Sequence, residues 1–575
     1  MNLFLKYKKS FLLKLKLLND KKLIILPAEF ENITVESSPK IYKSDISCNA
    51  SMVLAKINKK SPIELGELLK QFFLEEFQEF ESIEIVKPGF LNITFKADFW
   101  KKYLLSIYSS KADFGSYKVE NKKYNIEFVS ANPTGPLHVG HCRGAIIGDA
   151  ISNLLRFNGN AVVKEYYVND SGNQINNFVL SIYYRILEIT EKRKFPLDKD
   201  LYPGDYIIDI SNSILNKKSI TNFKDYKKIY TKLAEESLKV SMHIIKSNLI
   251  SLGVNHDNFV YESSLIENNL VSKTIDELKK EKFVYKGKLQ PPKGESIKNW
   301  KSRDQLLFNS TKFGDDSDRA IKKDDDTWTY FASDIAYHKH KIDRNFDVLI
   351  NILGADHAGY IKRISAAVKA LSKNKKSLQC KVSQLVKLYK KGIPFKMSKR
   401  KGDYITVADL VNEVGIDSVR FMMLNRSNDV ELDFDFEKVT EKSKDNPVFY
   451  VQYAYARINS IFKTLNLNIS SQIKINEKDF SLNKFEIDIL KKISEWPKCV
   501  EITTLKLEPH RIPYYLYDLA TLFHSYWNLG KENTKYRFVS NDNKQNNSRL
   551  LLIQAISIVI EKGMSILGVS TPKSM

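Results

Sequence analysis

Two imidazoles spaced three residues apart open a predicted helix that follows a loop rich in proline and glycine. They are His138 and His141, with Gly140 between them. The start of a helix offers backbone N–H groups and the positive end of the helix dipole to an anion, and glycine lets a ligand approach the backbone. Two imidazoles there can stabilise charge that develops on a phosphate. A pair of structural histidines that cap the helix is the simpler alternative.

A second segment, residues 392–402, is a basic loop between two glycines and includes Lys396, Met397 and Lys399. Lysines in such a loop can bind leaving phosphates, and the glycines permit the loop to move. A solvated charged loop is the alternative in a lysine-rich chain. Neither G-x-x-x-x-G-K-[ST] nor G-x-G-x-x-G is present, so the sequence supports neither a P-loop nor a dinucleotide fold.

The 575 residues carry a formal charge of +22, from 90 Lys and Arg against 68 Asp and Glu. This charge favours a polyanionic partner such as nucleic acid, although a coding bias towards lysine would produce the same excess. The four cysteines are scattered and suit a reducing cytosol, and no third ligand lies near the histidines, so we expect no zinc. Lysines interrupt the apolar N-terminus, which argues against a secretory signal. The apolar run at residues 550–560 is too short to span a bilayer and predicts a buried helix.

Alternating strands and helices must position both segments. Strands are expected at residues 124–129, 161–168, 348–353 and 385–389, with a helix at 140–158 and another ending near 367. This order predicts an α/β fold, a doubly wound parallel sheet, and the long polar stretch between its halves predicts an insertion. Helical periodicity from residue 446 onward predicts an all-α bundle.

The first hundred residues predict a separate small α/β domain. Phe4, Tyr7, Phe11, Leu15 and Leu18 recur at helical spacing, so an amphipathic helix is favoured over a targeting peptide. A further helix is expected at residues 61–80, and extended segments at 23–26, 33–35, 83–86 and 91–95.

The histidine and lysine segments together resemble the paired ATP-binding motifs of class I aminoacyl-tRNA synthetases. Their surroundings are similar to bacterial arginyl-tRNA synthetases over effectively the whole chain, in EFVSANPTGPLHVGHCRGAIIGDA, EYYVNDSGNQI, TYFASDIAYH, LGADHAGYIKR and DNPVFYVQYAYARI. Three positions depart from the general pattern. Arg400 replaces the last Ser of KMSKS, Cys142 stands where Gly is expected, and NSRL at residues 547–550 replaces DALR.

The resemblance implies a Rossmann-like catalytic domain at residues 120–385, with a connective insertion at about 180–310. It also implies an N-terminal tRNA-contacting domain at 1–110, the lysine loop with a stem-contact region at 386–445, and a C-terminal helical anticodon-binding domain at 446–575.

The resemblance also assigns residues to ATP. His138, Gly140 and His141 would hold ATP, Gly354, Asp356 and His357 would contact adenosine, and Lys396, Met397 and Lys399 would engage the leaving pyrophosphate. His138, His141, Lys396 and Lys399 would be catalytic. The complete first motif is Ala131, Asn132, Pro133, Thr134, Gly135, Pro136, Leu137, His138, Val139, Gly140 and His141.

For arginine, the resemblance points to Glu127, Asn132, His138, Tyr330 and Asp334. A carboxylate at Asp334 can bind a planar guanidinium through two hydrogen bonds, and Glu127 can pair with the α-ammonium. Tyr330 and Asp334 share a helical face. The structural alternative is that Asp334 caps a helix and Tyr330 fills the core.

The expected activity is arginine–tRNA ligation, with L-arginine, ATP, Mg²⁺ and tRNA(Arg) and without zinc or an editing domain. The family also implies that tRNA must bind before arginine is activated. We expect a cytoplasmic monomer with no membrane partner. The alternatives are another class I ligase, for cysteine or glutamate, and a catalytically silent tRNA-binding paralogue. A cysteine enzyme should show zinc-ligand spacing, and a glutamate site should carry basic residues at positions 127 and 334.

Overall fold

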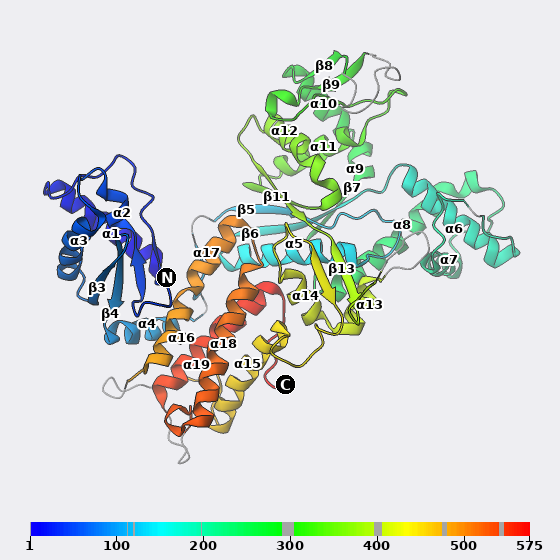
Figure 1. Ribbon diagram of the computed structural model, residues 1–575. Coiled ribbons are helices and arrows are strands. Elements are labelled where there is room, and N and C mark those ends of the chain that lie inside the picture. The colour runs from blue at the N-terminus through cyan, green and yellow to red at the C-terminus, as the bar shows by residue number, and fades with distance from the viewer. Residues whose placement is uncertain are drawn as a thin grey trace. The chain divides into compact units, whose positions relative to one another are not determined.

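The structure is a computed structural model (Figure 1) that describes residues 2–111, 113–118, 121–196, 198–289, 304–395, 405–473, 480–539 and 546–575. The chain forms two compact units. The central unit contains Val119–Glu441 and Leu567–Val569. The terminal unit contains Met1–Lys118, Lys442–Ile566 and Ser570–Met575.

A five-stranded parallel sheet lies in the middle of the central unit. β5 (Lys123–Glu127) lies between β11 (Val348–Gly354) and β6 (Ala161–Val168), and the edge strands are β12 (Leu378–Ser383) and β7 (Asn258–Tyr261). The chain order therefore reverses between β5 and β11. In sheets of this kind, ligands bind at the carboxyl ends of the strands beside the reversal. The expected doubly wound parallel sheet is confirmed.

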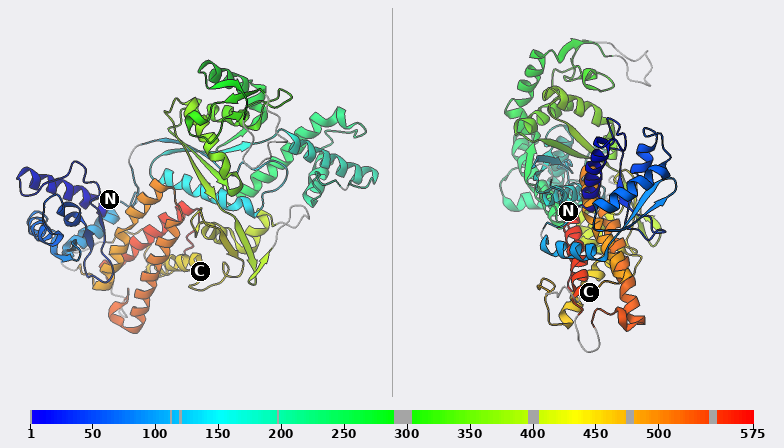
Figure 2. Two further views of the ribbon diagram at one scale, coloured as in Figure 1. Left: turned by 45° about the horizontal axis from the view of Figure 1, so that its top comes forward. Right: turned by 90° about the vertical axis from the view of Figure 1, so that its left-hand side faces the viewer.

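Helix α5 (Val139–Phe157) packs along one face of this sheet (Figures 1 and 2). Ile147, Ile151 and Leu154, on the predicted apolar face, are all buried. Gly148 lies so close to Phe128 that an added Cβ would come within 2.3 Å of the aromatic ring. This tight packing fixes the position of α5 and therefore of the histidines at its start.

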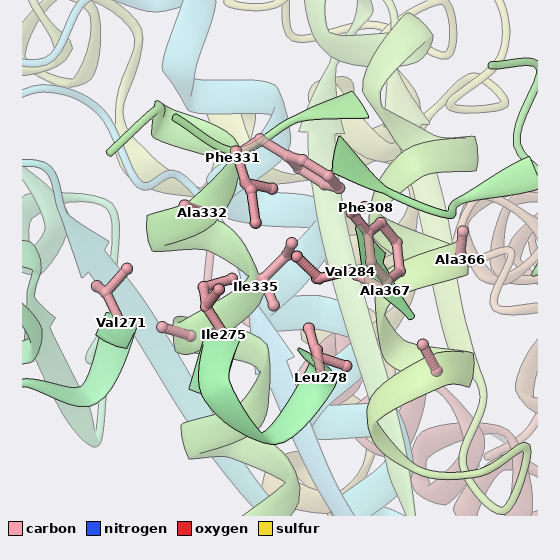
Figure 3. Packing of buried hydrophobic residues seen from close by; sticks show 13 residues of the cluster. Val271, Ile275, Leu278, Val284, Phe308, Phe331, Ala332, Ile335, Ala366 and Ala367 are labelled. Carbon is pink, nitrogen blue, oxygen red and sulfur yellow. The ribbon is translucent and has the colours of Figure 1, made fainter. Parts of the chain in front are cut away.

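A small antiparallel sheet of order β10-β9-β8 and three helices share a hydrophobic cluster, shown in Figure 3. Phe331, Ala332 and Ile335 of α11 point into this cluster (Figure 3), so that side of α11 is buried. The elements are β8 (Val284–Gly287), β9 (Gln305–Phe308), β10 (Arg319–Ala320), α10 (Leu270–Lys280), α11 (Tyr330–Asp343) and α12 (Ile361–Leu371).

Three helices, α6 (Asn173–Glu191), α7 (Asp205–Lys217) and α8 (Tyr226–Ser251), pack on one another and extend away from the main sheet (Figures 1 and 2). β7 and the short α9 (Glu262–Glu267) follow them. Residues 180–310, expected as an insertion, thus contain these helices together with an edge strand of the main sheet.

The strand expected at residues 385–389 corresponds to β13 (Val386–Lys390), but it does not extend the main sheet as predicted. It lies in a separate sheet of order β14-β13-β15. The edge position belongs to β12, whose sequence LQCKVS alternates apolar and polar residues in the pattern of a half-exposed strand. The remaining elements of the central unit are β14 (Ile393–Phe395), β15 (Leu432–Asp435), α13 (Val407–Val414), α14 (Ile416–Leu424), η2 (Thr311–Phe313) and η3 (Ala355–Tyr360).

The N-terminal part of the terminal unit is the predicted α/β domain. Its helix α1 (Leu3–Asp20) buries the whole predicted face, Phe4, Tyr7, Phe11, Leu15 and Leu18. The sheet has the antiparallel order β1-β2-β4-β3, and the extended segment expected at residues 23–26 is not a strand. The remaining elements are β1 (Val35–Ser37), β2 (Ile46–Cys48), α2 (Ala50–Ala55), α3 (Pro62–Glu76), β3 (Phe80–Val86), β4 (Phe90–Phe95) and α4 (Ala97–Ser109).

The C-terminal part of the terminal unit is helical, as predicted. Its last helix, α19 (Asn547–Leu567), is apolar and long enough to cross a membrane by length and composition, but 83% of its most apolar window is buried inside the protein. That burial identifies a core helix. The others are α15 (Pro447–Thr464), α16 (Lys484–Ser494), α17 (Trp496–Lys506), α18 (Arg511–Glu532) and η6 (Thr534–Tyr536).

Candidate active site

The first turn of α5 is held by its own histidines. The Nδ1 of His138 accepts a hydrogen bond of 3.1 Å from the Gly140 N–H, and the His138 N–H donates to Nδ1 of His141 at 3.3 Å. The two ring centroids are 4.0 Å apart. An added Cβ at Gly140 would lie 2.8 Å from the His138 ring, so the absence of a side chain there makes room for this imidazole.

The expectation of open N–H groups at this helix start is wrong for its first three residues. Val139 donates to the Ile405 carbonyl at 3.3 Å, and His141 donates to the His138 carbonyl at 2.8 Å. With Gly140 bonded to the His138 ring, all three N–H groups have acceptors within the protein. The capping role is therefore present, and an anion here would meet imidazole rings rather than bare backbone N–H groups.

The chain that follows the lysine segment returns to the histidines. Thr406 pairs with His138 in an antiparallel bridge, and the Val407 N–H donates to the Leu137 carbonyl at 3.0 Å. Lys396, Met397 and Lys399 lie outside the described residues. Their flanking segment is nevertheless fixed beside the start of α5, although the two motifs are far apart in the sequence.

Gly354, Asp356 and His357 lie at the carboxyl end of β11, next to β5. Asn351 of β11 is the register partner of Glu127, the last residue of β5, so both strands end at the same edge of the sheet. Asp356 and His357 are exposed, and their Oδ2 and Nε2 atoms are 3.5 Å apart. The structure therefore places these three residues on the edge where the sequence predicts the nucleotide.

The first turn of α11 carries the predicted arginine ligands. Thr329 caps the helix, and Tyr330 is 52% exposed, so the alternative in which Asp334 is the cap and Tyr330 fills the core is wrong. Burial, together with the negative charges of Glu127 and Glu262, raises the pKa of Asp334 to about 7. No other described residue forms a hydrogen bond or an ion pair with its carboxylate. A cation in this place would lower that pKa and pair with Asp334.

Glu127 and Asn132 are already engaged within the protein. The ammonium of Lys341 forms an ion pair with Glu127 Oε2, and the Ser130 hydroxyl donates to Oε1 at 3.1 Å. The Asn132 side chain donates to Gln174 Oε1 at 2.6 Å. The amine of a ligand would therefore interact with Glu127 while Lys341 remains paired with the same carboxylate.

Sequence reasoning missed three residues of this region, Lys341, Tyr167 and Glu262. Tyr167 stacks on Tyr337 with centroids 4.2 Å apart, and no described residue hydrogen-bonds to its buried hydroxyl. Glu262 is buried directly after β7 and accepts a hydrogen bond from Ser171. Recognition of residues 258–261 as a strand of the main sheet would have placed Glu262 at the same carboxyl edge.

The geometry combines two chemistries at one edge of the sheet. Paired imidazoles at α5 suit a phosphate, and the carboxylates of Glu127, Asp334 and Glu262 suit an organic cation. Within the described ranges, no group of three or more His, Cys, Asp or Glu side chains has the arrangement of a metal site.

Three family models match the chain. The model described as "tRNA synthetases class I (R), catalytic domain" matches residues 104–463, and "Arginyl tRNA synthetase N terminal domain" matches residues 13–95. The third, "DALR anticodon binding domain", matches residues 451–575, despite the altered sequence at residues 547–550.

Individual proteins agree with these models. The arginine–tRNA ligase of Pelagibacter ubique (strain HTCC1062) is 55% identical over 577 residues and covers 100% of both chains. That of Rhizobium etli (strain CIAT 652) is 42% identical and covers 95% of each. The crystal structure of a putative arginyl-tRNA synthetase from Campylobacter jejuni has a TM-score of 0.73 at 31% identity, covering 84% of this chain and 100% of that one. The Thermus thermophilus arginyl-tRNA synthetase shares the fold, with a TM-score of 0.69 at 18% identity over 94% of this chain and 96% of that one. The chain belongs to the arginyl-tRNA synthetases, within class I of the aminoacyl-tRNA synthetases.

Proposed function

We propose that the start of α5 and the carboxyl ends of β5, β6 and β11 form one site that activates arginine with ATP. The activity is arginine–tRNA ligation, in which arginine is joined to AMP and then transferred to tRNA. The bridge between Thr406 and His138 is the observation that carries the proposal. This bridge supports binding of one ATP triphosphate by both segments, because the chain next to the lysine segment is bonded to the histidine segment.

In the first step, a carboxylate oxygen of arginine attacks the α-phosphorus of ATP. The bond between that phosphorus and the oxygen bridging to the β-phosphate breaks, and pyrophosphate leaves. His138 and His141 stabilise the α-phosphate, while Lys396, Met397 and Lys399 engage the leaving group. Gly140, Gly354, Asp356 and His357 contact the rest of the nucleotide. Catalysis comes from positioning and charge stabilisation. Mg²⁺ bound to ATP would neutralise part of the phosphate charge.

Arginine binds with its guanidinium against Asp334 and Tyr330 and its α-ammonium near Glu127, Asn132 and His138. The Asp334 carboxylate supports this assignment because the described residues leave it without a hydrogen bond while two other acidic groups, Glu127 and Glu262, share its surroundings. A site built for a charged, planar head group rejects neutral citrulline, and it rejects lysine because one ammonium cannot replace the guanidinium fork. Polar mismatches of this kind provide about 10⁴–10⁵-fold discrimination.

In the second step, the 2′-hydroxyl of the terminal adenosine attacks the arginyl carbonyl and AMP leaves. Residues 1–110 and 446–575 contact the tRNA, the latter at the anticodon, and residues 386–445 contact its stem. The formal charge of +22 supports an extensive phosphate interface. We also propose that the protein is a cytoplasmic monomer and that bound tRNA is required for arginine activation.

The test is charging of tRNA(Arg) with arginine against the other nineteen amino acids, together with arginine-dependent ATP–pyrophosphate exchange in the presence of tRNA. H141A and K399A should each lower exchange by about 10²–10³-fold, whereas H243A, at an exposed position of α8, should not change it. Unchanged exchange in H141A and K399A would contradict the assigned roles. Binding of tRNA without charging by any amino acid would favour the catalytically silent alternative.

A further inference from the structure

Lys341 is a fully buried cation at the carboxyl edge of the main sheet. Its side chain is 0% exposed, while that of Glu127, its ion-pair partner, retains 12%. The Lys341 ammonium also donates to Asn351 Oδ1 at 3.1 Å and lies 4.4 Å from the centroid of the Tyr337 ring. A buried ammonium with this many partners holds them in a defined geometry, because breaking any one contact leaves charge unsatisfied.

The same network reaches the main chain of Asp334. Burial and the nearby Lys341 lower the pKa of His338 to about 3, so its imidazole is neutral. Its Nδ1–H donates to the Asp334 carbonyl at 2.8 Å. Its Nε2 must then accept from the Asn351 amide at 3.2 Å, which leaves Asn351 Oδ1 to accept from Lys341. One continuous set of hydrogen bonds thus connects Glu127 with the turn of α11 that carries Asp334.

An ion pair of Arg344, the residue directly after α11, provides a structural comparison. Arg344 donates two hydrogen bonds, of 2.6 and 2.8 Å, to Glu165, and the Tyr337 hydroxyl donates to Glu165 at 2.9 Å. Glu165 is the register partner of Glu127 on β6, so neighbouring strands each bind one cation of the same helix. Glu165 is fully buried, and among these two carboxylates only Glu127 is partly exposed. The Arg344 ion pair therefore stabilises the packing of α11 on the sheet. The Lys341 ion pair also fixes the Glu127 carboxylate, which is exposed enough to contact a ligand.

We infer that Lys341 is a positioning residue for arginine: it fixes the Glu127 carboxylate and, through Asn351 and His338, the position of Asp334. This inference rests on the proposed assignment of Glu127 and Asp334 to arginine. Lys341 itself makes no contact with the reacting atoms. Its role is to hold two carboxylates at the separation that the α-ammonium and guanidinium of one arginine require.

Loss of Lys341 should also change the titration of the site. Glu127 and Glu262 repel a negative charge on Asp334, while Lys341 and Arg363 favour it. Removing Lys341 therefore raises the pKa of Asp334 further, so arginine binding would require a higher pH. The titratable and charged groups that face Asp334 are Glu127 of β5, Tyr167 of β6, Glu262 of α9, Lys341 of α11, Tyr360 of η3 and Arg363 of α12.

The test compares K341M with R344M, which removes the cation at the C-cap of α11 that pairs with Glu165. We expect K341M to raise the arginine KM by roughly 10–100-fold with little change in the ATP KM. The pH below which kcat/KM for arginine falls, the acid limb of the profile, should rise by about one unit. R344M should lower the thermal midpoint without moving that limb. Equal thermal losses in both variants, with arginine KM and pH profile unchanged in K341M, would overturn the inference.

A double variant shows whether Lys341 acts through Glu127. In E127Q, only the route through Asn351 and His338 remains, so adding K341M should raise the arginine KM by a smaller factor than K341M does in the parent protein. A fully additive effect would contradict the inference. The double variant buries no unpaired charge, so it keeps the test valid if K341M fails to fold. If E127Q and D334N leave the arginine KM unchanged, the arginine-site assignment fails. If they raise it and K341M does not, only the role of Lys341 fails.

Discussion

The carboxylate of Asp149 on α5 binds the guanidinium of Arg420 on α14, and both side chains are buried. Lys164 of β6 donates to the other carboxylate oxygen of Asp149 at 2.9 Å. Arg420 also donates to the main-chain oxygens of Leu252 and Leu567. The helix α5, whose first turn carries the candidate histidines, is therefore joined to the sheet and to α14 by one buried network.

R420M should destabilise the central unit by about 3–5 kcal/mol, because it leaves Asp149 with one cation instead of two and two carbonyls without a donor. Burial alone would raise the pKa of Asp149, but Arg420 and Lys164 hold that pKa below its ordinary value. Its contribution to stability is therefore present above the ordinary carboxyl pKa and is lost as pH falls through the lower folded pKa. Urea denaturation at neutral and acidic pH measures both effects. Equal stability of R420M and the parent protein at pH 7 would contradict the role.

Arginine affinity should fall as pH decreases through about 7. The pKa of Asp334 is raised to about 7 in the free protein, whereas pairing with a guanidinium favours the ionised form, so binding releases a proton near neutrality. Below pH 7, the arginine KM should rise by about tenfold per pH unit. D334N should have a high arginine KM that does not rise further as the pH falls below 7. If the arginine KM of D334N still rises below pH 7, the titrating group is not Asp334.

G148A should disrupt the start of the site. Its Cβ would meet the Phe128 ring at 2.3 Å, so α5 or the segment that follows β5 must move. Overpacking of this kind costs about 1–3 kcal/mol, and charging activity should fall with it. The matched control is G144A on the same helix, where no atom lies within 4 Å of the added Cβ. G144A should be neutral or stabilising, by up to about 1 kcal/mol. Thermal unfolding and tRNA charging of both variants test this difference.

Binding of tRNA should weaken steeply with salt. Each phosphate neutralised by Lys or Arg contributes a slope of about −0.9 for duplex or −0.7 for single strands to log K against log [salt]. A tRNA contacting many phosphates should therefore lose several orders of magnitude in affinity between low and moderate salt. Filter binding across a salt series measures the slope. A flat response would attribute the charge of +22 to lysine-rich coding rather than to tRNA.

Local pattern was sufficient for the elements that carry the histidines. The apolar run before residue 128, the helical spacing of Ile147, Ile151 and Leu154, and the strand at 161–168 all have direct counterparts. The strand β7 was not predicted, because its four residues, which follow a long polar helix, are too few to show a clear periodicity. β12 was missed although its alternating apolar and polar residues are typical of a half-exposed strand.

The candidate site was only partly predictable for a different reason. Lys341 and Glu127 are 214 positions apart, and their pairing depends on the register between β5 and β11, which periodicity cannot specify. The acceptor of the Val139 N–H at the start of α5 is the Ile405 carbonyl, another distant partner. Composition and spacing identify reactive side chains, but the contacts that orient them come from chain segments brought together only by folding.

The backbone bonds of Leu137 and Val139 to residues 405–407 have a kinetic consequence. Residues 405–407, which follow the lysine segment, are bonded through the main chain to residues 137–139, so they cannot separate from the start of α5 without breaking these bonds. Substitutions that weaken these main-chain bonds should reduce nucleotide affinity and slow adenylate formation together. A further mutation should not correct one of these defects without the other.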